Sequence, residues 1–283
     1  MRIASRNSLF QANKNYFNVG NKEPIFISST FNMEIYMTTL SILKETLKSS
    51  ELTLSVEGMF SNKRVTLSAN NNMTFKWLGS GTNKNVFRIV GEPWVLAIAG
   101  MSKTAEGDIL DEVKTLRRIA KCGIKVPKPF QGNISATDKD FTFSLDGLWD
   151  DQAGSRMAFI QEYLPYIEMK KANNPENFVK LNIIGRTRTN IIAAALRDLS
   201  KIQRAYKFTP WGDFQVMYNR STGNFYVFDP MPTPNPGQFG LKTPDVLLKT
   251  WIKQLEDDLF ASAQRQRVSK SILERYIKES TLV

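Results

Sequence analysis

The spacing of apolar residues divides the chain into a strand-rich part and a helical part. Residues 33–48 carry apolar side chains at helical spacing, which predicts one amphipathic helix near the start. Short apolar runs between turn-forming residues predict strands at Leu52–Glu57, Val65–Ser68, Thr74–Leu78, Val86–Val90, Trp94–Ile98, Phe141–Leu145 and Met157–Glu162. A helix over Asp108–Lys121, ended by Gly123, is expected between the strands Trp94–Ile98 and Phe141–Leu145.

The second half of the chain follows a helical period that one hairpin interrupts. Asn190–Tyr206 predicts a helix capped by Thr189 or Asn190. Val216–Tyr218 and Phe225–Phe228 flank a short turn and predict a hairpin. Two closing helices are expected over Asp245–Phe260 and Ser269–Ile277.

These elements predict an α+β protein in three segments. Asn70-Asn71-Asn72 marks a loop between an N-terminal leader, residues 1–72, and a strand-rich segment, residues 73–165. Residues 166–283 form the helical segment. Hydrophobic residues make up 42% of the chain, which is enough to bury a sizeable core.

The residue types present exclude several kinds of active site. The chain has one cysteine, Cys122, and no histidine. An internal disulfide, a Cys/His zinc site and a Ser-His-Asp or Cys-His catalytic group are therefore impossible. Acid–base chemistry must come from carboxylates, lysine or tyrosine, while a hard metal ion remains open through Asp, Asn and Gln oxygens.

Hydropathy and charge limit the possible cellular location and binding partners of the protein. No apolar run reaches the roughly 18 residues that a membrane-spanning helix needs, and residues 1–6 lack a secretory hydrophobic stretch. We expect a soluble, cytoplasmic, monomeric protein, or one that a dedicated machine exports into a host cell. The net charge of +11 favours polyanionic partners or simply keeps the protein in solution. No nucleic-acid-binding signature accompanies the charge, so no DNA partner is expected.

Three groups of residues carry candidate chemistry. Gly79 and Gly81 lie between two predicted strands, where bare backbone N–H groups can approach phosphate oxygens. Glu112 lies on the helix after the strand Trp94–Ile98. Asp213 precedes the predicted hairpin and Asp229 ends it, so the two carboxylates can converge, one as a base and one on Mg²⁺. Each feature alone also fits a hairpin turn or a solvated charge.

Taken in order from Phe75 to Phe260, these features resemble the protein kinase family. The resemblance implies a two-lobed fold, with a five-stranded antiparallel N-lobe holding one helix and a reduced helical C-lobe. It also implies ATP and Mg²⁺ as cofactors. In that family a glycine-rich loop covers the phosphates and a strand lysine pairs with a helix glutamate. A catalytic Asp accepts the substrate proton, and an Asn and a second Asp hold the metal.

The glycine loop and the hinge match the family residue by residue. Gly79, Gly81 and Val86 fit G-x-G-x-x-G-x-V, with Lys84 at the third glycine. Phe159–Pro165 looks like the hinge strand that borders adenine. The nucleotide-binding positions that the resemblance implies are Gly79, Ser80, Gly81, Lys84, Val86, Ala97, Glu162 and Leu164.

The catalytic loop is a rougher match. Asp213 is the carboxylate that can act as the base, in a loop shorter than the family's H-R-D-L-x-x-x-N. Gln215 takes the place of the metal-binding Asn, and Asn219 is the other amide candidate. Asp229 matches the D-F-G aspartate, with Pro230-Met231 replacing Phe-Gly.

The sharpest departure is Ala99, which occupies the lysine place of V-A-I-K, while Glu112 matches the helix glutamate. Alanine there is expected to leave Glu112 without its partner and to lower the rate by roughly 10²–10³. Three explanations stay open: a deliberate inactivating substitution, a natural pseudokinase, or another cation in the same place. Lys84 and Lys103 are the candidate cations, and one kinase group is similar in supplying its lysine from the glycine-loop side.

The leading hypothesis is ATP-dependent phosphoryl transfer to Ser, Thr or Tyr of a protein substrate. This activity would be weak if no other cation compensates for Ala99. The short chain after Asp229 resembles the minimal kinases of bacterial effectors and phages, where such enzymes serve virulence. Two other hypotheses remain. One is a small-molecule phosphotransferase or AMP transferase, suggested by Gly212-Asp213, and the other is a non-catalytic binding module.

Overall fold

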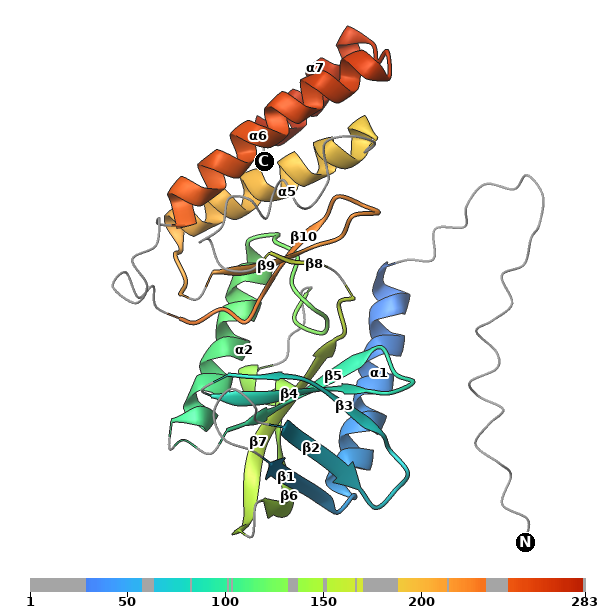
Figure 1. Cartoon of the computed structure of the whole chain (residues 1–283), viewed down its shortest axis with the longest axis vertical. Coiled ribbons are helices and arrows are strands. Elements are labelled where there is room, and N and C mark those ends of the chain that lie inside the picture. Colours follow the sequence, from blue (N-terminus) through green and yellow to red (C-terminus); the bar gives the residue numbers. More distant parts are fainter. Residues whose placement is uncertain are drawn as a thin grey trace, which may run out of the picture. The chain divides into compact units, whose positions relative to one another are not determined.

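The computed structural model describes residues 29–57, 64–81, 83–100, 102, 104–131, 137–149, 152–165, 167–169, 188–212, 214–232 and 244–281. Over these ranges the protein is mixed α+β (Figure 1). Residues 40–283 form one compact unit, and residues 1–39 form another.

A seven-stranded sheet is the larger of the two sheets in the described residues. Its strands run in the order β2-β1-β6-β7-β5-β4-β3, and every neighbouring pair is antiparallel except β1 and β6. The strands are β1 (Leu52–Glu57), β2 (Arg64–Ala69), β3 (Phe75–Ser80), β4 (Lys84–Ile89), β5 (Trp94–Ala99), β6 (Thr142–Trp149) and β7 (Gln152–Glu162). The sheet has two strands more than the five that were expected, because β1 pairs with β6 and β2 pairs with β1.

The turn at Asn70-Asn71-Asn72 joins β2 to β3 within this sheet. Ser68 and Thr74 form an isolated antiparallel bridge across it, and Asn72 adopts a left-handed φ of 63° that asparagine tolerates. The two outermost strands of the sheet therefore meet at one end. The hairpin that the sequence placed in the leader is structurally continuous with β3–β7.

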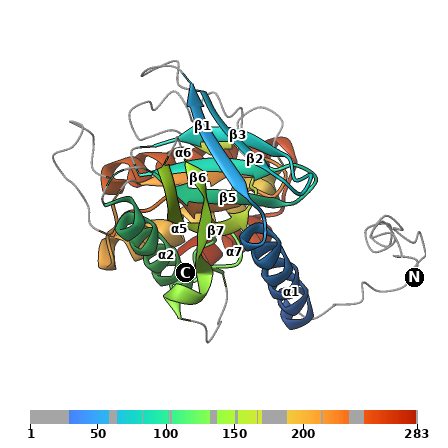
Figure 2. The ribbon, with the colours of Figure 1, turned by 90° about the horizontal axis from the view of Figure 1, so that it is seen from below.

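Five α-helices accompany the sheets in the described residues. They are α1 (Ser29–Lys48), α2 (Ala105–Lys121), α5 (Thr189–Phe208), α6 (Pro244–Arg265) and α7 (Lys270–Thr281), and a short 3₁₀ helix, η4, covers Asp138–Phe141. Helix α2 contacts β5 and β7 and runs beside β7 in Figure 2. The N-cap of α5 is Arg188 rather than Thr189 or Asn190, since the Thr189 hydroxyl lies 3.0 Å from Ser262 on α6.

A three-stranded sheet lies between the large sheet and helices α5–α7 (Figure 1). It consists of β8 (Ile167–Met169), which the sequence did not predict, and the expected hairpin strands β9 (Gln215–Tyr218) and β10 (Phe225–Phe228). Burial alternates along β9 and β10, so one face of the hairpin enters the core and the other face is left half-exposed. The half-exposed face includes Gln215 and Phe228.

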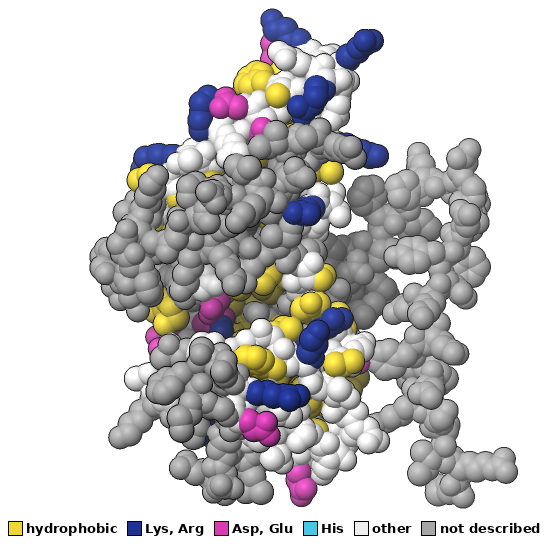
Figure 3. All heavy atoms as spheres, viewed as in Figure 1, with side chains coloured by type: hydrophobic (Ala, Val, Ile, Leu, Met, Phe, Trp, Pro, Cys, Tyr) yellow, Lys and Arg dark blue, Asp and Glu magenta, His cyan; other side chains and the backbone are white. Residues whose placement is uncertain are grey.

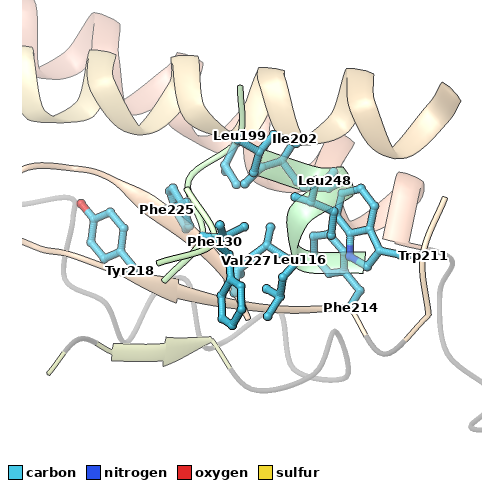
Figure 4. Close-up of a cluster of buried hydrophobic side chains, with 14 of the residues drawn as sticks. Leu116, Phe130, Leu199, Ile202, Trp211, Phe214, Tyr218, Phe225, Val227 and Leu248 are labelled. Atoms are coloured by element: carbon cyan, nitrogen blue, oxygen red, sulfur yellow. The ribbon is translucent and has the colours of Figure 1, made fainter. Parts of the chain in front are cut away.

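One continuous apolar core joins these layers. Leu116 of α2, Leu199 of α5 and Leu248 of α6 gather around the buried side of the hairpin (Figure 4). Trp211 and Phe214 stack with ring centroids 6.0 Å apart at the entrance to β9. The hairpin that ends at Asp229 is therefore anchored from both the helical side and the sheet side.

A partly buried ion pair also fixes this hairpin. The Lys125 ammonium lies 2.7 Å and 2.6 Å from the two carboxylate oxygens of Asp198 on α5. Asp198 in turn accepts a hydrogen bond from the Phe225 N–H at 3.1 Å, and the Val227 N–H donates to the Lys125 carbonyl at 2.9 Å. These contacts hold β10 against α5 and the segment that follows α2.

Basic residues do not form a single patch on the face shown in Figure 3. Lys and Arg side chains are spread over the helices at the top and over the sheet below, interspersed with acidic ones. Among the described helices, none has the length and apolar character needed to cross a membrane.

Candidate functional site

A cavity of about 350 Å³ opens between the glycine loop, the end of β7 and the β9–β10 hairpin. Its size lies at the lower end of the range of about 300–1,000 Å³ that is typical of small-molecule sites. Nine of the sequence-predicted residues line it: Gly79, Ser80, Gly81, Lys84, Val86, Glu162, Leu164, Gln215 and Asp229. The cavity therefore brings together residues that lie far apart in the chain.

The glycine loop covers one side of the cavity with bare backbone. A Cβ atom built at Gly79 or Gly81 would meet no atom within 4 Å, so the protein's own packing does not require glycine there. The pairing of β3 with β4 shifts register between Trp77 and Gly79, and this bulge lies beside Leu78, which lines the cavity. The open space above these glycines suits the close approach of a ligand to the backbone.

The expectation that Ala99 leaves Glu112 without a cation is wrong. Lys84 and Ala99 are directly paired on the neighbouring strands β4 and β5, so their side chains point to the same face of the sheet. The small side chain of Ala99, 2% exposed, leaves the space into which the Lys84 ammonium extends to contact the Glu112 carboxylate. Glu112 is therefore paired with a lysine, and this lysine comes from β4, the strand next to Ala99.

Lys84 also contacts Asp229, at 2.6 Å from Oδ1. Burial lowers the pKa of Lys84, but the charges of Glu112 and Asp229 and their hydrogen bonds outweigh that effect and raise its pKa above the ordinary value. Lys84 is therefore firmly protonated at neutral pH. One buried cation joins α2, β4 and the end of β10 at the floor of the cavity.

Asp229 lies where the hairpin returns to the cavity. Its φ of 50° places it in the left-handed region, which aspartate enters more readily than most residues. The Gln215 amide nitrogen donates to Asp229 Oδ2 at 3.2 Å, so the two candidate metal-binding residues are adjacent. Asn219 lies in the hairpin turn instead, where its side-chain oxygen accepts the Ser221 N–H at 2.9 Å. The structure thus brings Gln215, and not Asn219, to Asp229.

The end of β7 is the stretch that was expected to resemble a kinase hinge strand. The Glu162 N–H donates to the Lys128 carbonyl at 2.7 Å, and the Tyr163 N–H donates to the Pro93 carbonyl at 2.8 Å. These bonds fix the strand end where Glu162 and Leu164 line the cavity. Glu162 pairs with Trp94 and Lys84 pairs with Ala99, so these two residues lie beside opposite ends of β5.

Some predicted residues are not part of this arrangement. Asp213 and Lys103 lie outside the described residues. Ala97 does not line the cavity and is buried in the core. Within the described ranges, no cluster of three or more Asp, Glu, Cys or His side chains is placed to hold a metal ion.

The cavity also contains residues that the sequence did not single out, namely Leu78, Val95, Pro127, Gln161, Tyr163, Met217 and Phe228. Two of them were detectable. Met217 follows the period of two from Gln215, and Phe228 pairs with Gln215 across the hairpin. Gln161 directly follows the apolar run Ala158–Ile160 and precedes Glu162, so the sequence pattern does not distinguish it.

The chain was compared with known proteins. No protein-family model matches it, and no curated protein sequence matches it.

Proposed function

We propose that this chain is a protein kinase-like phosphotransferase that uses ATP and Mg²⁺, with Lys84 as its phosphate-binding lysine. In this proposal the seven-stranded sheet with α2 corresponds to the N-lobe, and the β9–β10 hairpin with α5–α7 corresponds to a reduced C-lobe. The observation that carries the proposal is the convergence of Lys84, Glu112 and Asp229 at one end of a cavity whose roof is bare glycine backbone.

The donor set fits a nucleotide polyphosphate. A buried, protonated lysine offers positive charge and hydrogen-bond donors to phosphate oxygens, and the uncrowded glycine backbone lets those oxygens approach closely. The apolar side chains of Val86, Val95 and Met217 offer the flat apolar surface that a purine ring needs. Glu112 orients the lysine, since it is only 3% exposed and contacts its ammonium.

Asp229 and Gln215 would hold the metal ion. Mg²⁺ in such sites is bound by one or two protein oxygens together with substrate phosphates, so a small protein donor set is adequate. When bound, the metal would neutralise charge on the transferring phosphoryl group. Asp213 remains the proposed general base, which would accept the proton of a substrate hydroxyl.

The test combines nucleotide binding with phosphate transfer. The full chain is titrated with ATP and Mg²⁺ by calorimetry, then incubated with γ-labelled ATP and candidate protein or small-molecule acceptors. We expect binding by the native chain, and we expect Asp213→Asn to abolish transfer while binding is retained. Asp257→Asn, on the exposed face of α6, is the matched control. A folded chain that does not bind ATP would refute the proposal.

The same experiment separates the competing functions. Mass spectrometry of the modified acceptor distinguishes an added phosphate from an added AMP. Binding of ATP without transfer to any acceptor, in a chain that retains Lys84, would favour the non-catalytic binding module over the enzyme.

A further inference from the structure

One end of the helical layer concentrates positive charge. There the turn between α6 and α7 contacts the start of α5, because the Thr189 N–H donates to Gln266 Oε1 at 3.3 Å and the Thr189 hydroxyl lies 3.0 Å from the Ser262 hydroxyl. In Figure 1 this end is the one that points away from the two sheets. The basic tip, as we call it, consists of four exposed residues at this contact: Arg188, Arg265, Arg267 and Lys270.

Arg267 occupies a position that usually belongs to glycine. Helix α6 ends with the Arg267 N–H donating to the Gln264 carbonyl at 3.2 Å and the Val268 N–H donating to the Ala263 carbonyl at 2.9 Å, which is the Schellman pattern. The residue at the place of Arg267 in this pattern has a left-handed φ, here 51°, which glycine adopts at the lowest cost. Local backbone stability therefore does not explain an arginine at this position.

The starts of α5 and α7 break a second local preference in the same direction. The N-cap of α5 is Arg188, whose side chain makes no capping hydrogen bond. The first turns of α5 and α7 contain no acidic residue, although the positive end of a helix dipole favours one there. Asp258, which interacts electrostatically with Arg265, and Glu274, 3.8 Å from Lys270, offset only part of the charge. Three local preferences are thus broken, each toward more positive potential, and such departures are expected at functional sites.

An exposed aliphatic side chain lies beside these cations. Ile272, in the first turn of α7, is 38% exposed, and side chains on a helix lean toward its N-terminus, here toward the basic tip. We propose that the basic tip docks onto an anionic lipid surface, with its cations against the lipid phosphates and Ile272 entering the boundary between headgroups and acyl chains. A nucleic acid would neutralise the same cations but would offer Ile272 no apolar medium. This inference does not depend on the proposed function.

The test measures binding of the full chain to vesicles of equal parts phosphatidylcholine and phosphatidylserine by cosedimentation. The variant is Arg188→Ser/Arg267→Gly, in which serine is a favoured N-cap and glycine fits the left-handed φ, so its unfolding temperature should be unchanged or higher. Each basic residue near such a surface contributes about a fivefold factor in affinity, and we expect the variant to bind about 30-fold more weakly than the native chain. Vesicles of phosphatidylcholine alone should bind neither protein.

The matched control removes the same charge from the other half of α6. Lys249 and Lys253 have side chains that are 66% and 71% exposed, and Lys253 lies about 18 Å from Arg265 along the helix axis at 1.5 Å per residue. This separation exceeds the Debye length of about 8 Å at physiological salt, so Lys249→Gln/Lys253→Gln should bind the vesicles as the native chain does. Equal binding by the native chain and Arg188→Ser/Arg267→Gly, or an equal loss in the control, would overturn the inference.

A second variant separates a lipid surface from other polyanions. Ile272→Ser keeps every charge of the basic tip, and we expect it to weaken vesicle binding about fivefold, because part of an aliphatic side chain no longer leaves water. Unchanged vesicle binding by Ile272→Ser would contradict docking through this face. Binding of the native chain to a short single-stranded RNA and not to the vesicles would overturn the inference in favour of a nucleic-acid partner.

Discussion

Lys84 and Ala99 face each other across β4 and β5, and the lysine occupies the space that the alanine leaves. The cation expected on one strand is thus supplied by its neighbour, and it reaches Glu112 and Asp229 from there. Of the three explanations considered for Ala99, this geometry favours substitution by another cation. The lysine can therefore be moved from position 84 to position 99 as an experimental test.

Replacement of Lys84 by methionine should remove phosphate transfer. Loss of one preorganised charge facing the reacting group typically lowers the rate by about 10²–10³, and we expect a decrease of that size together with weaker ATP binding. Steady-state transfer assays and calorimetry would measure both. Lys76→Met is the control, since Lys76 is exposed on β3. Full activity of Lys84→Met would exclude the assigned role.

Moving the lysine back to β5 provides a second test. Ala99→Lys alone should destabilise the protein by about 1–3 kcal/mol or more, because it overfills a buried position and adds a like charge beside Lys84. In the double variant Lys84→Ala/Ala99→Lys the clash is absent, and we expect part of the activity lost in Lys84→Ala to return. Thermal unfolding and transfer assays on the four proteins complete the cycle. Additive effects would show that the two positions do not share one site.

Local patterns predicted most of the elements, because apolar periodicity and turn residues act over short distances. The bounds of β1 were predicted without error, and β5 and α2 extend only slightly beyond the predicted ranges. Sheet membership was harder. The pairing of β1 with β6 joins residues such as Leu52 and Gly147, and nothing local to either strand specifies a parallel partner so far away.

The site shows the same division between local and non-local information. Gly79, Glu112 and Asp229 were recognisable because each follows a motif with fixed spacing. The role of Lys84 was one of several open possibilities, since a sequence alone does not give the register between β4 and β5. The direct pairing of residues 84 and 99 decides which lysine approaches Glu112.

Glu112 and Asp111 are adjacent in α2 but differ in burial, which provides a matched pair of stability measurements. Glu112 contacts the buried Lys84, so Glu112→Gln should lower the free energy of unfolding by about 1.5–3 kcal/mol. Asp111 forms an ion pair with Lys114 at 3.1 Å whose side chains are 43% and 55% exposed. Asp111→Asn should therefore change the free energy by no more than about 0.5 kcal/mol. Urea unfolding would measure both, and equal effects would contradict a buried Lys84–Glu112 contact.

Because Tyr218 is buried on β9, we expect the protein to lose stability at alkaline pH. Burial raises the pKa of Tyr218 to about 12, against an ordinary value of about 10. Between these values the unfolded chain releases a proton that the folded chain retains, so the free energy of unfolding falls as pH rises from about 10 to 12. Tyr218→Phe removes this contribution, which amounts to about 2 kcal/mol by pH 12. The raised pKa of Lys84 acts in the same direction in both proteins, so it cancels when their urea-unfolding curves are compared at each pH. Parallel pH profiles for the two proteins would show that the Tyr218 hydroxyl ionises as freely in the folded state as in the unfolded one.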